Sequence, residues 1–105
     1  MKRGEIWWAE LGPPAGRRPV LLLSRDEAYS VRSLITIAPV TTRVRGIASE
    51  VPLGTNDGLP HKCVANLDTI NTIPKDCLRS RLAVLNAKKI KETDDAICFA
   101  LGIEK

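Results

Sequence analysis

Residues 17–24 have the sequence Arg-Arg-Pro-Val-Leu-Leu-Leu-Ser, and this stretch decides the fold class. The apolar run that begins at Pro19 is continuous and has the length of a strand, which is typical of a strand in a protein core. Proline fixes its own backbone and pushes the residue before it into an extended conformation. The stretch therefore predicts a core strand that holds Arg18 rigidly at the rim of a sheet.

Further short segments on either side of this run are predicted to be strands. They are apolar or rich in β-branched residues, and clusters of Gly, Pro, Asn and Asp punctuate the chain between them. The predicted strands span residues 6–11, 19–24, 34–40, 50–53, 63–67, 69–73 and 82–85, and residues 74–78 are predicted to form one helical turn. The segment 69–73 is either a strand of its own or the continuation of the strand before it.

The period of the apolar residues changes at the C-terminal end of the chain. Asn86 has the chemistry of a helix N-cap, and Gly102 that of a C-terminal stop. The apolar side chains that share one face at helical spacing are Ile90, Ile97 and Leu101. Many short strands followed by one amphipathic helix predict a single domain over residues 1–105. Its fold class is mostly β, a small curled sheet or barrel with a C-terminal helix packed against it.

The composition is that of an ordinary globular protein, since 44% of the 105 residues are hydrophobic and 27% are charged. The three cysteines form no Cys-x-x-Cys pair, and no motif for a metal or another cofactor is present. The single histidine, His61, lies in a turn-rich stretch and is interpreted as a surface loop residue. Because no signal peptide and no apolar run near the roughly 20 residues that span a bilayer is found, a cytoplasmic protein is expected.

The net charge of +4 is concentrated in the first half of the chain. Residues 1–49 contain eight basic and four acidic side chains, whereas residues 50–105 contain eight of each. The basic residues of the first half are mostly arginines, whose guanidinium groups suit bidentate contact with phosphate and stacking on bases. A nucleic acid is therefore one interpretation of this charge, and a solvated basic face is the other.

Three groups of polar residues lie next to predicted strands, at residues 17–18, 41–43 and 66–71. The hydroxyls and the guanidinium of the second group, Thr41, Thr42 and Arg43, could converge on a phosphate. The third group contains Asn66, Asp68 and Asn71. Each group alone also has a plain structural interpretation, as solubilising arginines, strand-end threonines and turn-forming residues.

The segments 3–8, 12–14, 17–20, 38–42 and 72–73 occur in an order and at a spacing that resemble the MazF/PemK/Kid family of toxin endoribonucleases. The stretch 41–51 further resembles a mycobacterial type of MazF. The resemblance implies an SH3-like β-barrel with a C-terminal helix, and a homodimer. It also implies sequence-specific, metal-independent cleavage of single-stranded RNA that inhibits translation. The implied partner is a MazE-like antitoxin with an acidic tail, which lies in the RNA groove and supports autoregulatory DNA binding.

The resemblance also assigns site residues. Arg18 falls on the catalytic arginine before proline, Thr41 on a catalytic strand-end hydroxyl, although Thr42 is an alternative, and Asp68 on an acidic active-site position of some members. The predicted RNA-binding residues are Arg17, Arg25, Thr42, Arg43, Arg45, Asn66 and Asn71. The loop before Arg18 is shorter than in most members, and Asn66 stands where some members have a second arginine.

The chemistry of RNA explains why an arginine, a threonine and an aspartate suffice to cleave it without a metal ion. RNA carries its own nucleophile, the 2′-hydroxyl, so that attack on the adjacent phosphate needs no metal-bound water. Arg18 can stabilise the charge on the phosphate, Thr41 can orient it, and Asp68 can accept the 2′-hydroxyl proton if burial raises its pKa.

Two alternatives come from other functional classes. A non-catalytic nucleic-acid-binding barrel would share the basic surface. A gyrase poison similar to CcdB would share the fold, but its Trp-Gly-Ile end is replaced here by Leu101-Gly102-Ile103 and two further residues.

Overall fold

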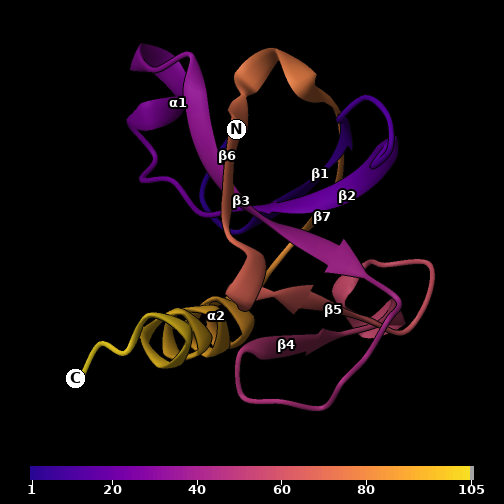
Figure 1. The fold of residues 1–105 in the computed structure, drawn as a ribbon, viewed down its shortest axis with the longest axis vertical. Coiled ribbons are helices and arrows are strands. Elements are labelled where there is room, and N and C mark those ends of the chain that lie inside the picture. Colours follow the sequence, from indigo (N-terminus) through magenta and orange to yellow (C-terminus); the bar gives the residue numbers. More distant parts are fainter. Residues whose placement is uncertain (105) are drawn as a thin grey trace.

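The structure, a computed structural model, describes residues 1–104, which form seven β-strands, two α-helices and three short 3-10 helices (Figure 1). The strands are β1 (Glu5–Glu10), β2 (Arg17–Leu22), β3 (Leu34–Thr41), β4 (Glu50–Leu53), β5 (Cys63–Asn66), β6 (Asn71–Pro74) and β7 (Leu78–Val84). The helices are α1 (Ala28–Val31), α2 (Ala87–Leu101), η1 (Thr55–Asp57), η2 (Leu67–Thr69) and η3 (Lys75–Cys77).

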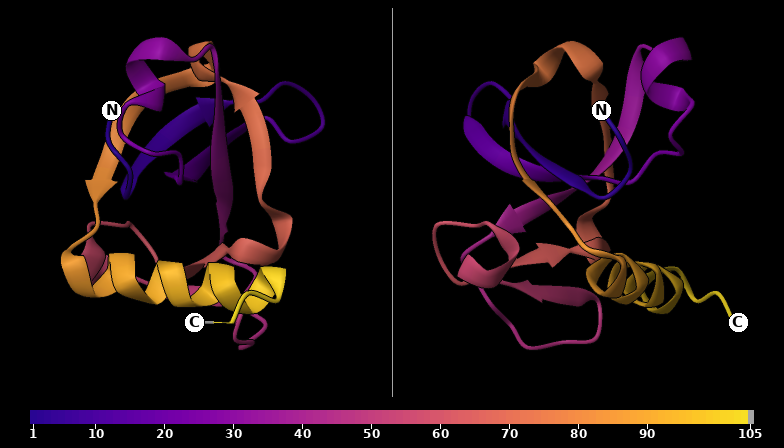
Figure 2. Two further views of the ribbon diagram at one scale, coloured as in Figure 1. Left: turned by 90° about the vertical axis from the view of Figure 1, so that its left-hand side faces the viewer. Right: turned by 180° about the vertical axis from the view of Figure 1, so that it is seen from behind.

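The strands form one antiparallel sheet in the order β4-β5-β3-β2-β1-β7, with β6 also paired to β3. Strand β3 belongs to two ladders, because Leu34–Ile37 pair with β6 while Val40 and Thr41 pair with β5. The sheet therefore bends along β3 and curls, and α2 runs along one end of it (Figure 2). The predicted mostly β fold with a C-terminal helix is confirmed, as a curled half-barrel.

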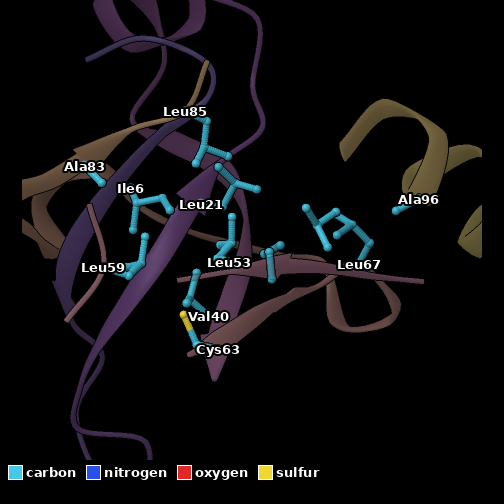
Figure 3. Close-up of a cluster of buried hydrophobic side chains, with 13 residues drawn as sticks. Ile6, Leu21, Val40, Leu53, Leu59, Cys63, Leu67, Ala83, Leu85 and Ala96 are labelled. Carbon is cyan, nitrogen blue, oxygen red and sulfur yellow. The ribbon is translucent and has the colours of Figure 1, made fainter. Parts of the chain in front are cut away.

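Residues 20–22 of strand β2 are buried on both faces of the sheet, which explains their continuous apolar sequence. Val20, Leu21 and Leu22 each have 0% of their surface exposed. Leu21 points into the main core (Figure 3), whose buried residues are Ile6, Leu21, Ala38, Val40, Val51, Leu53, Leu59, Cys63, Ala65, Leu67, Ala83, Leu85 and Ala96. Val20 and Leu22 point into the second core, made of Ala9, Val20, Leu22, Tyr29, Ile35, Ile37, Ile73 and Leu78.

Helix α2 begins and ends where the sequence predicts. The side chain of Asn86 accepts a hydrogen bond of 2.9 Å from the backbone N–H of Lys89, and Gly102 ends the helix at a φ of 69°. Ala96 is buried in the main core, and Ile90 and Ile97 pack against it. The prediction that Leu101 shares this buried face is wrong, because Leu101 is 60% exposed. It is the last residue of the helix, next to the Gly102 stop.

Three elements differ from the predicted ones. Strand β7 begins at Leu78, earlier than predicted, because Leu78, Ser80 and Arg81 pair with β1 although the exposed residues 79–81 have no apolar pattern. Helix α1 was not predicted, since four residues carry no helical period. The segment 69–73 is divided between η2 and β6, and the predicted helical turn 74–78 is observed as η3.

Replacing Gly4 with alanine is expected to destabilise the fold by about 1–3 kcal/mol. Gly4 has a φ of +91°, and a Cβ atom there would lie 2.8 Å from Cδ1 of Ile90 on α2. The variant Gly12→Ala is the control, because Gly12 has a φ of +72° and nothing within 4 Å of a Cβ atom. Urea unfolding of both variants checks the prediction, and equal losses of stability would show that the approach to Ile90 contributes nothing.

Candidate active site

A pocket of about 330 Å³ lies at the edge of the sheet where β2 begins and β3 ends. Its polar lining comprises Arg17, Arg18, Thr41, Thr42 and His61. Its apolar wall is continuous with the main core and includes Trp8, Pro19, Val40, Leu59, Cys63 and Leu82. Val40 and Cys63 lie at one end of that core (Figure 3).

The antiparallel order of the strands brings these residues together. Arg18 is at the start of β2 and Thr41 at the end of β3, and in an antiparallel pair these ends share one edge. Val20 pairs with Pro39, so the same register continued by two residues aligns Arg18 with Thr41. Strand β5 runs antiparallel to β3 and pairs Val64 with Thr41, which puts the segment before β5 at this edge as well.

The guanidinium group of Arg18 is oriented by the loop that precedes it. Its Nε–H donates a hydrogen bond of 2.9 Å to the carbonyl oxygen of Ala15. Within residues 1–104 the Nη groups of Arg18 make no hydrogen bond, and the side chain is exposed. A guanidinium has five N–H donors in a planar fork, so four donors of this pocket-lining side chain stay available for a ligand.

Arg17 stacks on an aromatic ring in the same pocket. Its guanidinium carbon lies 4.9 Å from the centre of the Trp8 ring, which is a cation–π contact. The neighbouring Trp7 points to the other face of the sheet, where it packs against the second core and donates a hydrogen bond of 2.9 Å to Glu5. The two tryptophans therefore have different roles, and Trp8 is the one that faces the pocket.

The loop after β3 extends the polar lining. The hydroxyl oxygen of Thr41 accepts a hydrogen bond of 3.1 Å from the backbone N–H of Arg43. The carboxylate of Glu50 holds the loop further along, because it accepts hydrogen bonds from the backbone N–H groups of Arg45 and Gly46 at 3.0 and 2.9 Å. The side chains of Arg43 and Arg45 are exposed on this loop, next to the pocket.

His61 lines the pocket, although a lone histidine in a turn-rich stretch is indistinguishable in sequence from other surface loop residues. It lies in the segment that leads from η1 into β5, and its side chain is exposed. The nearby Cys63 is buried, and burial, with a smaller contribution from Asp57, raises the pKa of its thiol above the ordinary value.

The other predicted site residues lie away from the pocket. Asn66, Asp68 and Asn71 gather at the opposite end of β5, around η2, where Asp68 accepts a hydrogen bond of 2.5 Å from the hydroxyl of Ser49. The side chain of Asp68 is exposed, so the burial on which its predicted role as a base depends is not observed. Arg25 is exposed on the loop between β2 and α1.

The described part of the chain has no feature typical of a metal site or of a membrane-spanning helix. Residues 1–104 contain no group of three or more His, Cys, Asp or Glu side chains placed to hold a metal ion. None of the helices in this range has the length and apolar character needed to cross a membrane.

The curled half-barrel with a C-terminal helix places the chain in a class of small toxins. The chain belongs to the family of PemK-like, MazF-like toxins of type II toxin–antitoxin systems, whose match covers residues 2–101. It is 40% identical over 102 residues to a probable endoribonuclease MazF5 of Mycobacterium tuberculosis, covering 96% of this chain and 89% of that protein.

Solved structures agree with this assignment. The Mycobacterium tuberculosis toxin MazF-mt6 superposes with a TM-score of 0.89 at 34% identity, covering 96% of this chain and 99% of that one. An endoribonuclease in complex with its cognate antitoxin from mycobacterial species superposes with a TM-score of 0.88 at 28% identity. The match covers 100% of this chain and 98% of that one.

Proposed function

We propose that this protein is a toxin endoribonuclease that cuts single-stranded RNA at a preferred short sequence. The observation that carries the proposal is that Arg18 and Thr41, predicted separately from the sequence, line one pocket. The endoribonuclease relatives support it, because the chain matches them over nearly its full length.

The pocket suits a reaction in which RNA supplies the nucleophile. The 2′-oxygen attacks the adjacent phosphorus, and the products carry a 2′,3′-cyclic phosphate and a 5′-hydroxyl. Negative charge builds up on the phosphate oxygens in the transition state, and the fixed guanidinium of Arg18 stabilises it. The hydroxyl of Thr41 orients the phosphate from the facing strand end.

Other basic and aromatic groups around the pocket bind the rest of the RNA. Arg17 and Thr42 line the pocket, and Arg43 and Arg45 extend its positive surface along the loop after β3. The face of Trp8 offers a ring on which an unpaired base can stack. Arg25, Asn66 and Asn71 are proposed to contact RNA only beyond the pocket, since they lie on other parts of the surface.

The sequence predicts Asp68 as the residue that accepts the 2′-hydroxyl proton. Strand β5 separates it from the pocket of its own chain, and three residue steps of a strand span roughly 10 Å. Asp68 therefore takes part in catalysis only if a second copy of the chain in a homodimer brings it to the pocket.

We also infer a cytoplasmic location and an antitoxin partner. Relatives of this chain have been solved as complexes, an endoribonuclease with its cognate antitoxin and MazE–MazF from Deinococcus radiodurans. A pocket lined by Arg17 and Arg18 and by no carboxylate within residues 1–104 suits the acidic tail of a MazE-like antitoxin, which would compete with RNA.

Incubating the purified protein with mixed RNA in the presence of EDTA tests the proposed activity. We expect cleavage at a recurring short sequence, with a cyclic phosphate at each new 3′ end, because the nucleophile is part of the substrate. Sequencing the RNA ends identifies the recognised sequence. Binding of RNA without any cut would instead favour a non-catalytic nucleic-acid-binding barrel.

The affinity for single-stranded RNA is expected to fall steeply with salt. If Arg17, Arg18, Arg43 and Arg45 each neutralise one phosphate, log K falls with log salt at a slope of about −3. A fourfold rise in salt then weakens binding by about 50-fold. Fluorescence anisotropy at several salt concentrations measures the slope, and the double variant R43A/R45A should make it shallower by about 1.4. An affinity independent of salt would contradict this mode of binding.

A further inference from the structure

The pocket lacks an acidic side chain that could accept a proton. Among residues 1–104, its charged and polar lining consists of two arginines, two threonines, one histidine and one cysteine. Cleavage requires the 2′-hydroxyl to lose its proton as it attacks phosphorus. Because Asp68 lies beyond the far end of β5, the same chain must supply another acceptor or depend on its partner.

Three of these side-chain types are unsuited to the transfer. The guanidinium groups of Arg17 and Arg18 stay protonated at every pH at which a protein works. The hydroxyls of Thr41 and Thr42 are weak acids and weak bases. They can orient a phosphate, but they do not hold the proton that the 2′-hydroxyl loses. The thiol of Cys63 is buried, and its raised pKa keeps it protonated at neutral pH.

His61 is the remaining polar residue of the pocket lining, and its imidazole is the side-chain group best suited to proton transfer at neutral pH. Imidazole changes its charge between about pH 5 and 8 and is the commonest general acid or base in enzymes. Its side chain is exposed, so an incoming RNA can reach it. It lies on the segment before β5, and this segment meets the ends of β2 and β3 at one edge of the sheet.

We propose that His61 is the catalytic base of this pocket and accepts the proton of the attacking 2′-hydroxyl. The inference rests on the proposed endoribonuclease function and deepens it. As the 2′-oxygen bonds to phosphorus, its proton moves to the neutral ring nitrogen of His61. The bond between phosphorus and the 5′-oxygen breaks, and its electron pair stays on that oxygen, which takes a proton from water. The imidazolium then releases its proton to solvent.

The charged and titratable groups near His61 come from the pocket and from its own segment. Arg17 and Arg18 of β2 line the same pocket, and Cys63 and Lys62 belong to the segment of His61. Asp57 of η1 lies close enough to affect Cys63. Arginine, lysine and a protonated thiol do not change charge between pH 5 and 8, and a carboxylate loses its charge only below this range. A change of rate in this window therefore reports on His61.

Single-turnover cleavage at saturating RNA tests the proposal, with His61→Gln and the control Lys62→Gln. Lys62 is the next residue and does not line the pocket. We expect His61→Gln to lower the rate constant by about 100-fold or more, with RNA affinity nearly unchanged. Lys62→Gln should keep the wild-type rate constant. Wild-type cleavage should rise with pH between about 5 and 8, and the rise should be absent in His61→Gln.

Two further variants separate a catalytic base from a residue that only binds RNA. Added imidazole should restore part of the activity of His61→Gly, because it supplies the missing acceptor to the space left by the side chain. Asp68→Asn is the competing variant, and it should lose less of the single-turnover rate constant than His61→Gln does. A large loss in Asp68→Asn together with wild-type rates in His61→Gln would assign the base to Asp68 and overturn the proposal.

The remaining outcomes distinguish this inference from the function on which it rests. If the wild-type protein cuts RNA and His61→Gln does so with the same rate constant and the same pH profile, the role of His61 is refuted and the nuclease stands. A loss of affinity with an unchanged rate constant also refutes it. If the wild-type protein binds RNA but never cuts it, the endoribonuclease function itself fails.

Discussion

The variant Arg18→Ala is expected to cut RNA about 100- to 1,000-fold more slowly than the wild-type protein, as in other enzymes that lose one fixed donor to a transition-state oxyanion. The Nε–H of Arg18 is held by the carbonyl oxygen of Ala15, which orients the side chain at the pocket and leaves its other four donors available. The loss should fall mainly on the single-turnover rate constant, because charge on the phosphate oxygens increases in the transition state.

The choice of control makes this experiment specific. Arg79→Ala removes an exposed guanidinium that bonds to the carbonyl oxygen of Asp76, outside the pocket, and should leave the rate unchanged. Arg18→Lys keeps the positive charge but lacks the planar fork, so it should recover only part of the activity. Wild-type rates in Arg18→Ala would remove this residue from the mechanism.

Replacing Leu21 with alanine is expected to destabilise the protein by about 2–5 kcal/mol. Leu21 is 0% exposed, lies on the central strand β2 and packs among the side chains of the main core (Figure 3). The cavity left by the truncation is surrounded by a sheet that cannot close around it. Because domains of this size are stable by only about 5–15 kcal/mol, the loss is a large part of the total.

Urea unfolding followed by tryptophan fluorescence measures this loss through the midpoint and slope. Leu34→Ala is the matched control, since Leu34 is 46% exposed at the start of β3 and should cost no more than about 0.5 kcal/mol. Similar midpoints for the two leucine variants would contradict the assignment of Leu21 to the core.

The sequence predicted the elements whose pattern is local. The run after Pro19 identified β2, and the Asn86 cap with the Gly102 stop identified α2, because capping and burial leave their mark on neighbouring residues. Strand β7 is predicted only in part, since its residues 79–81 are polar and resemble a loop.

The site required the order of the strands, which no local pattern contains. Arg18 and Thr41 were both placed at strand ends, and the antiparallel pairing of β2 and β3 brings them to one edge. Strand β5 is also antiparallel to β3, so the residues before and after β5 lie at opposite edges of the sheet. His61 precedes β5 and lines the pocket, whereas Asp68 follows β5 and lies at the other edge. A lone histidine in a turn carries no spacing from which this could be predicted.

Strand β3 has a consequence for how the molecule melts. Its first half is hydrogen-bonded to β6 and its second half to β5, and its side chains alternate between both cores. Neither half of the sheet can come apart without exposing the strand that the other half needs, so melting is all-or-none. The pocket lies at the last residues of that strand, so a molecule in which the sheet has opened has also lost the pocket, and partly unfolded molecules are expected to be inactive.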